Sequence, residues 1–215
     1  MYRLTQEQIK KMVYLPQHSE DMNLMPKQAR GDTVNFAFGG NIGSVQNVEC
    51  IIKAVAELKD LSGFVVNIYG DGSELENCKE LAKKLNTGSK IIFHGRVDKQ
   101  TLWQEYEKVD AFLLTLKSEG VIGLTAPAKL QEYMSGNRPI IASIGGAAAE
   151  IIGSAKCGVA VEPNDYIALA KAMKDFVLKG NICQTLNPQK LDLHENAFAV
   201  CVDGVSKGVF DCLPE

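Results

Sequence analysis

The sequence lacks the cysteine patterns that mark metal sites and disulfide frameworks. Its 215 residues include six cysteines and three histidines, but no Cys-x-x-Cys pair and no zinc-like spacing of the two residue types. Disulfide frameworks are typical of much shorter secreted chains. We therefore expect free thiols in a reducing cytoplasm, and no metal site.

Long apolar runs and blocks of positive charge are also missing. No run approaches the ~20 residues that span a bilayer, and the N-terminal MYRLTQEQIKKM has no stretch resembling a signal peptide. The net charge is −3, without a local cluster of Lys or Arg, which argues against nucleic acid as a partner. The composition, 46% apolar and 23% charged, is that of a globular protein, which we expect in the cytoplasm.

The sequence does contain a regular alternation of short β-branched runs and amphipathic stretches. The runs expected to form strands are 34–38, 64–69, 90–93, 111–114, 139–142 and 158–161. The helices expected between them are 46–59, a helix capped by Ser73 with Glu76, 98–108 capped by Asp98, 127–135, 146–153 and 164–178. Strands that are apolar throughout are buried on both faces. The pattern predicts an α/β fold: a doubly wound, mostly parallel, Rossmann-like sheet with helices on both faces.

The two ends of the chain are less regular. Residues 1–32 contain one further expected strand at 11–15, followed by a polar connector, and residues 33–180 hold the repeated βα pattern. Residues 181–215 lack clean periodicity, so their structure is not predicted. We expect one α/β domain with an entry segment and a tail.

Glycine-rich loops follow most of the expected strands. In a doubly wound sheet, ligands bind outside the carboxyl ends of the strands. The loops that lie there are 39–43, 70–72, 95–97, 115–120 and 145–146. Each glycine alone is typical of a turn, but five such loops at one edge favour a site where backbone N–H groups approach a ligand.

That site does not match two common nucleotide-binding motifs. The loop after the first sheet strand, FGGNIGS, lacks the G-x-G-x-x-G order, and Tyr69 is followed by Gly70 rather than by an acidic residue. No Gly-Lys-Ser/Thr is present either. Both NAD and P-loop interpretations are disfavoured.

The helix expected at 127–135 carries charges suited to a nucleoside diphosphate. Pro127 suits its first turn, and Lys129 and Glu132 lie three residues apart on one face. The helix N-terminus and the Lys129 ammonium would stabilise a diphosphate, and the Glu132 carboxylate could accept both ribose hydroxyls. The alternative is an ordinary surface ion pair between the two side chains.

Longer segments resemble a known family. PAKLQEYMSGNRPIIASIGGAAAEII and CGVAVEPNDYIALAKAM are similar to the C-terminal, donor-binding domain of family-4-type retaining glycosyltransferases of the GT-B fold. The branch most resembled builds bacterial capsule, O-antigen or exopolysaccharide. FGGNIGSVQNVE, IYGDGSELE, FHGRV and VDAFLLTL also match, so the resemblance covers roughly residues 10 to 178.

The resemblance implies a role for each loop. Glu132 would bind the ribose, the backbone of Gly95, Arg96 and Val97 would receive the base, and Gly39, Gly40 and Lys129 would lie near the diphosphate. The full set of expected binding residues is Gly39, Gly40, Asn41, Gly70, Asp71, Gly95, Arg96, Val97, Lys129 and Glu132. The resemblance implies a nucleotide sugar as the ligand, with UDP the commonest nucleotide in this branch and GDP as the alternative. No other cofactor or metal is required, and no covalent nucleophile is apparent.

The sequence departs from the family pattern in three places. The family carries a second glutamate eight residues before Glu132, where this chain has Leu124; Glu119 is the candidate catalytic replacement. The family's phosphate-binding Arg and Lys are replaced by Asn41 and Gln46. The C-terminal helix that crosses to the other half is not recognisable in residues 181–215.

The N-terminal, acceptor-binding half of a GT-B enzyme is not recognisable either. Residues 14–21, YLPQHSED, resemble the segment just after the interdomain linker. We expect a fragment of a longer enzyme or a partner-dependent subunit, inactive alone, whose parent acts on a saccharide or lipid-linked acceptor and can associate peripherally with a membrane. Two alternatives are a non-catalytic partner of a split glycosyltransferase and a sugar-nucleotide epimerase-like enzyme.

Overall fold

The computed structural model describes residues 22, 24, 31–117 and 126–179. The strand expected at 11–15, the candidate Glu119 and the tail 181–215 lie outside the described residues. Most of the expected βα pattern, and every expected binding residue, lies within them.

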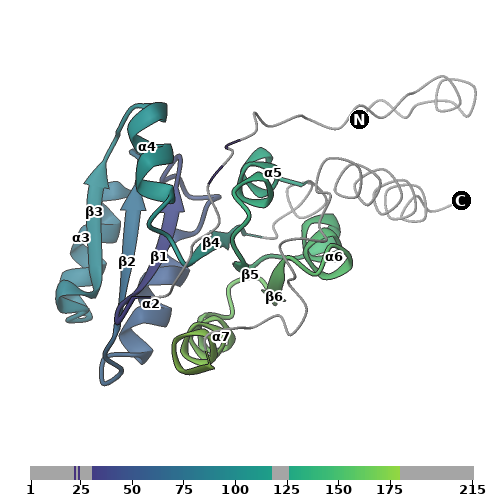
Figure 1. Cartoon of the computed structure of the whole chain (residues 1–215). Coiled ribbons are helices and arrows are strands. Elements are labelled where there is room, and N and C mark those ends of the chain that lie inside the picture. Colours follow the sequence, from purple (N-terminus) through teal and green to yellow (C-terminus); the bar gives the residue numbers. More distant parts are fainter. Residues whose placement is uncertain (1–21, 23, 25–30, 118–125, 180–215) are drawn as a thin grey trace, which may run out of the picture.

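A six-stranded parallel sheet forms the centre of the molecule (Figure 1). Its strands are β1 Val34–Gly39, β2 Phe64–Tyr69, β3 Ile91–Gly95, β4 Ala111–Thr115, β5 Ile140–Ser143 and β6 Gly158–Val161. They lie in the order β3-β2-β1-β4-β5-β6, which confirms the doubly wound, Rossmann-like fold. The order reverses between β1 and β4, and a crevice for ligands forms at such a switch point.

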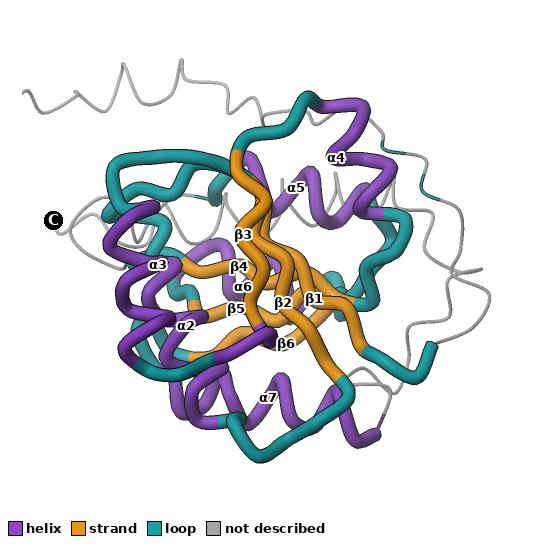
Figure 2. The backbone as a smooth tube through the Cα atoms, turned by 90° about the vertical axis from the view of Figure 1, so that its left-hand side faces the viewer, coloured by secondary structure: helices purple, strands orange, loops and turns teal. Residues whose placement is uncertain are grey.

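Helices cover both faces of the sheet (Figure 2). One face carries α2 Val48–Glu57, α3 Leu75–Lys84 and α7 Tyr166–Lys179. The other carries α4 Lys99–Tyr106, α5 Ala128–Ser135 and α6 Gly146–Ser154. A 3₁₀ turn, η1 Gly88–Lys90, leads into β3. None of the helices among these described residues is long and apolar enough to cross a membrane.

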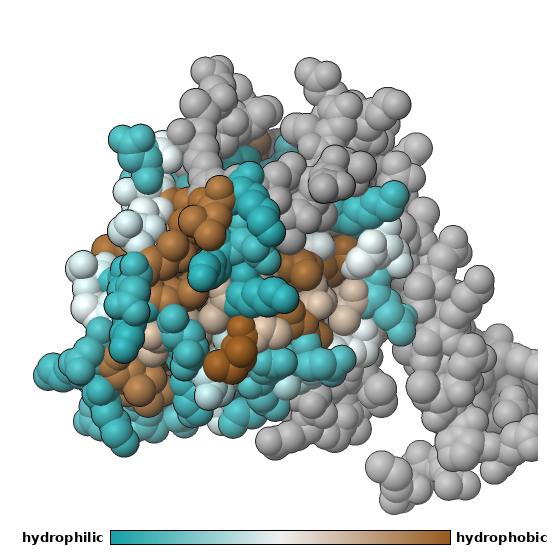
Figure 3. Space-filling view, turned by 90° about the horizontal axis from the view of Figure 1, so that it is seen from below, coloured by the Kyte–Doolittle hydropathy of each residue, from teal (hydrophilic) through white to brown (hydrophobic). Residues whose placement is uncertain are grey.

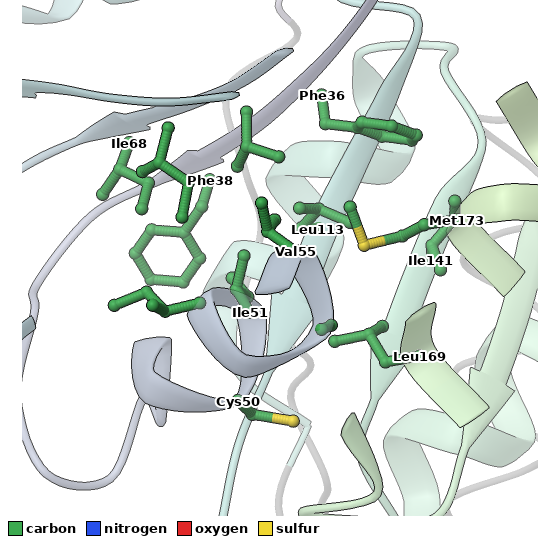
Figure 4. Close-up of a cluster of buried hydrophobic side chains, with 14 of the residues drawn as sticks. Phe36, Phe38, Cys50, Ile51, Val55, Ile68, Leu113, Ile141, Leu169 and Met173 are labelled. Atoms are coloured by element: carbon green, nitrogen blue, oxygen red, sulfur yellow. The ribbon is translucent and has the colours of Figure 1, made fainter. Parts of the chain in front are cut away.

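Alternation along the strands divides the core into two clusters. In β1, Phe36 and Phe38 pack toward α2 and α7, while Ala37 faces α5 and α6. Figure 4 shows Ile51 of α2 next to Phe38, with Met173 of α7 farther along the same layer. A fully buried side chain of this size contributes roughly 1.5–3 kcal/mol to folding. The helices on each face of the sheet therefore pack on their own hydrophobic cluster, and both clusters include side chains of the same strands.

The helix starts show one correct and one wrong capping prediction. Asp98 caps α4 as expected, since its carboxylate accepts hydrogen bonds from the Thr101 N–H at 3.0 Å and the Thr101 hydroxyl at 2.6 Å. The prediction for Ser73 is wrong because α3 begins at Leu75 with Glu74 as its N-cap. The Glu74 N–H donates to the Ile42 carbonyl at 2.9 Å, so a loop distant in sequence binds the residue that precedes α3.

The lower face of the molecule is chemically mixed. Hydrophobic and hydrophilic residues interleave across it (Figure 3). Two apolar side chains of α7, Ile167 and Leu178, are 54% and 62% exposed. Singly exposed apolar side chains are ordinary on folded proteins and define no interaction surface.

Candidate functional site

Three glycine-rich loops at the carboxyl edge of the sheet are hydrogen-bonded to one another. The Gly40 N–H donates to the Tyr69 carbonyl at 2.9 Å, Ile42 N–H to Asp71 at 2.8 Å, and Gly70 N–H to Gly95 at 2.7 Å. These bonds bring together the loops that follow β1, β2 and β3. We name these residues, 39–43, 70–72 and 95, the glycine cluster.

The glycine amides were expected to face a ligand, and several of them do not. The N–H groups of Gly40 and Gly70 serve the loop-to-loop bonds, and the Gly39 N–H donates to the Tyr133 hydroxyl at 2.8 Å. Within the described part of the chain, the N–H groups of Asn41 and Gly43 donate no hydrogen bond. The free backbone donors of the glycine cluster therefore include those of Asn41 and Gly43.

Two glycines are required by close approach. A Cβ on Gly70, which has φ 133°, would lie 1.8 Å from the Gly40 carbonyl oxygen. A Cβ on Gly40, with φ 128°, would lie 2.7 Å from the end of the Lys129 side chain. The first glycine permits packing of one loop on another, and the second permits a lysine from α5 to reach the loop after β1.

Lys129 lies in the first turn of α5 with its ammonium at the switch point. Its Nζ is 3.8 Å from the centroid of the Phe38 ring, which is a cation–π contact. Burial lowers the pKa of Lys129 to about 8, against the opposing influence of Glu132. The ammonium has no hydrogen bond or ion pair among the described residues. A half-buried ammonium without an ion pair is electrostatically suited to a nearby anion, which makes Lys129 a candidate binding residue.

Glu132 lies one helical turn after Lys129. Its half-buried carboxylate accepts no hydrogen bond within the described residues. No Lys129–Glu132 ion pair forms within 4.0 Å, so the alternative of a surface ion pair is not what the structure contains. The charge of Glu132 contributes to raising the pKa values of the buried Tyr106 and Tyr133, after the larger effect of burial. Its carboxylate therefore remains available to donors from outside.

The loop expected to receive a base is open on its outer side. Gly95 has φ 71°, and a Cβ placed on it would meet nothing within 4 Å. Arg96 is exposed, and Val97 packs partly into the cluster beneath α4. Asp71, also among the expected residues, is exposed and caps its own turn by accepting the Gly72 N–H at 2.7 Å. The structure brings Gly39, Gly40 and Lys129 together, with Gly95 to Val97 farther out beyond β2.

The loop after β4 is also tied to the loop after β1. The Lys117 N–H donates to the Val45 carbonyl at 2.9 Å, and the Thr115 hydroxyl donates to the Gln46 carbonyl at 2.7 Å. Glu119 follows this anchor but lies outside the described residues. Its expected catalytic role stays a prediction.

A cavity of about 280 Å³ opens beside the site rather than in it. It lies between the loop after β1, the start of α2 and α3, and is lined by Gly43, Ser44, Asn47, Val48, Glu49, Glu74, Asn77, Cys78, Leu81 and Lys117. Neither Lys129 nor Glu132 lines it. Of the described residues in the expected site loops, Gly43 and Lys117 alone border this cavity.

Two features of the site were not found from the sequence. Tyr69 stacks on His94 with ring centroids 4.3 Å apart, next to the base loop. The Tyr133 hydroxyl bonds to Gly39 at the end of β1. The spacing of Tyr133 four residues after Lys129, which places both on one face of a helix, was the one available signal in the sequence.

Comparison with known proteins identifies the family. The sheet order and the charged α5 start define a Rossmann-like α/β domain of the kind found in GT-B proteins. The chain belongs to the family "Glycosyl transferases group 1", whose model matches residues 23–192.

Individual relatives carry glycosyltransferase names. The chain is 25% identical over 171 residues to the lipopolysaccharide 1,6-galactosyltransferase of Escherichia coli, covering 77% of this chain and 45% of that protein. It is 30% identical over 143 residues to the probable glycosyltransferase WbjE of Pseudomonas aeruginosa, covering 66% and 35%. The chain thus spans less than half the length of either relative.

A solved structure shows the same fold. The lipopolysaccharide outer core galactosyltransferase WaaB in its apo form matches with a TM-score of 0.66 and 20% identity. The match covers 96% of this chain and 59% of that one. The GT-B expectation from the sequence is confirmed.

Proposed function

We propose that this chain is the donor-binding domain of a retaining glycosyltransferase that uses a UDP-linked sugar in surface polysaccharide synthesis. The observation that carries the proposal is the half-buried Lys129 ammonium, which lies at the switch point beside Gly40 and has no hydrogen bond or ion pair among the described residues. A nucleoside diphosphate supplies the opposite charge.

The diphosphate would lie between the start of α5 and the loop after β1. Lys129 supplies a cation, the unpaired N–H groups of Asn41 and Gly43 supply donors, and the N-terminus of α5 adds its dipole. These groups take the place of the family's Arg and Lys. Binding an anion would also favour the protonated form of Lys129, whose pKa of about 8 is otherwise lowered by burial.

The nucleoside would extend from α5 toward β3. Glu132 lies one turn deeper in α5 with a carboxylate that has no internal donor, which suits two ribose hydroxyls. The base would reach the open loop at Gly95, Arg96 and Val97. Charge-assisted hydrogen bonds of this kind are worth roughly 1.5–3 kcal/mol each.

Catalysis by the parent enzyme would rest on positioning the donor and stabilising the departing diphosphate. Lys129 and the two free N–H groups face the charge that grows as the glycosidic bond breaks. The saccharide or lipid-linked acceptor would bind between this domain and an N-terminal GT-B half. We expect the chain alone to bind nucleotide and to transfer little or no sugar.

A ligand panel tests the proposal. We expect thermal stabilisation of the chain by UDP, then by GDP, with ADP and NAD weaker, since stabilisation grows with the ratio of ligand concentration to Kd. Stabilisation by NAD above all nucleoside diphosphates would refute the proposal. Glu132→Ala should lose most of the UDP effect while the ligand-free melting temperature stays close to that of the wild type.

A further inference from the structure

We propose that the Tyr133 hydroxyl is a positioning group that fixes the Gly39–Gly40 turn against Lys129 and so sets the geometry of the phosphate site. The inference rests on the proposed function. It adds a residue that touches no ligand and acts through the backbone of β1.

The Tyr133 hydroxyl satisfies both polar backbone groups of Gly39. It accepts a hydrogen bond from the Gly39 N–H at 2.8 Å and donates to the Gly39 carbonyl at 3.3 Å. Tyr133 is fully buried, and the bond joins residues 94 positions apart in the sequence. A buried backbone N–H without a partner is destabilising, so this hydroxyl satisfies a polar group that the sheet leaves without an acceptor.

The sheet leaves Gly39 without a partner strand on its β4 side. On the β2 side, β1 stays in register up to Gly39↔Tyr69, but on the β4 side pairing ends at Ala37↔Phe112. The two strands separate there, and this separation opens the switch point. The Tyr133 hydroxyl takes the place of the missing β4 partner of Gly39.

The Tyr133 ring is held rigidly. It stacks on Phe112 with centroids 4.2 Å apart and an interplanar angle of 6°, and it meets Tyr106 edge-on at 6.1 Å. Because these ring contacts already fix the Tyr133 side chain, its hydroxyl is held in place for the hydrogen bond to Gly39. The hydrogen bond from this hydroxyl therefore fixes the end of β1 relative to α5.

A second side chain of α5, Lys129, lies beside the next residue of the turn, Gly40. Lys129 is four residues before Tyr133, so both side chains lie on one face of α5. Lys129 lies against Gly40, and Tyr133 binds Gly39. Two side chains of one helix thus lie at consecutive residues of the turn, and the bond from Tyr133 fixes the backbone beside the Lys129 ammonium.

Tyr106 offers a matched control. Its ring is buried in the same aromatic group, and its hydroxyl is close enough to the Tyr133 hydroxyl to influence the pKa of that residue, but it makes no hydrogen bond to Gly39. Tyr106→Phe and Tyr133→Phe each remove one buried hydroxyl and keep the ring. Only the second removes a bond to Gly39.

The experiment measures the Kd of UDP and of uridine for the whole chain and both variants. We expect Tyr133→Phe to weaken UDP binding roughly tenfold while the Kd of uridine, which has no phosphate, stays within twofold. Tyr106→Phe should leave both constants within twofold. Amide hydrogen exchange at Gly39 should accelerate in Tyr133→Phe alone, which reports on the bond independently of any ligand.

Three results would count against the inference. Unchanged UDP binding by Tyr133→Phe, or unchanged exchange at Gly39, removes the positioning role. Equal losses for UDP and uridine reduce Tyr133 to general structural support. If the wild-type chain does not bind UDP at all, the proposed function itself is wrong. If the wild type binds UDP and Tyr133→Phe binds it equally well, only the positioning role of Tyr133 is wrong.

Discussion

The glycine cluster and the start of α5 lie side by side at one edge of the sheet, but they use their polar groups in opposite ways. In the cluster, the N–H groups of Gly40, Ile42 and Gly70 are bonded to neighbouring loops. At the start of α5, the Lys129 ammonium and the Glu132 carboxylate have no hydrogen bond or ion pair within the part of the chain that the structure describes. The cluster therefore builds the rim, and α5 supplies most of the chemistry. Glycine content alone marks the place of a site without identifying its binding groups.

The largest expected effect comes from a methyl group inside the glycine cluster. Gly70→Ala places a Cβ 1.8 Å from the Gly40 carbonyl oxygen at φ 133°, and we expect a loss of about 3 kcal/mol or more in the free energy of unfolding. Urea denaturation measures this loss. Gly95→Ala is the control, since its Cβ meets nothing within 4 Å at φ 71°; its cost should be about 1 kcal/mol. Equal costs for the two would mean that the loops do not pack as described.

A second substitution tests the contact between the cluster and the aromatic group beneath it. In Gly39→Ala the new Cβ would lie 1.9 Å from the Tyr106 hydroxyl oxygen and 3.1 Å from the ring carbon that carries it. We expect a loss of roughly 2–3 kcal/mol in the free energy of unfolding. Tyr106→Phe removes the clashing oxygen, so the double variant should recover about 1 kcal/mol or more. Additive effects in this double-mutant cycle would contradict the contact.

The next prediction concerns α5 alone. Glu132→Gln keeps the shape of the side chain but loses its charge, and we expect UDP to bind roughly tenfold more weakly with little change in stability. Calorimetric titration provides both Kd values. Glu150→Gln, at an exposed position on α6, should bind UDP as the wild type does. If both variants bound UDP equally well, Glu132 would have no role in the site.

The smallest effect is a pH dependence with opposite signs for stability and binding. Lys129 has a pKa of about 8 in the folded chain, lowered by burial from 10.5. Between these values the unfolded chain binds more protons, so the ligand-free protein should become more stable as pH rises from about 8 toward 10.5. UDP affinity should fall as pH rises through about 8, because the cation is lost. Lys129→Met should remove both trends; a wild-type slope in that variant would assign them to another group.

The strands were predictable because buried parallel strands are apolar throughout. β2 and β6 match their expected bounds, and the other four shift by one or two residues at their ends. The Asp98 cap was predictable because its partner, Thr101, is three residues away. Local chemistry was sufficient in these cases.

Features that depend on distant residues could not be predicted. The Ser73 cap was wrong because α3 begins only at Leu75, after a turn whose Glu74 N–H is bonded to the Ile42 carbonyl of another loop. The internal use of the glycine amides and the bond from Tyr133 to Gly39 are likewise contacts between segments far apart in sequence. The sequence located Lys129 and Glu132 at the ligand edge, but only the fold shows which donors beside them remain free.

The central claim is that the Lys129 ammonium, unpaired at the switch point, binds the diphosphate of a nucleotide sugar. Calorimetric titration of UDP into the wild-type chain and into Lys129→Met at pH 7 tests it most directly. The account predicts measurable binding by the wild type and at least a roughly tenfold higher Kd for the variant. Equal affinities, or no binding of UDP by the wild-type chain, would contradict it.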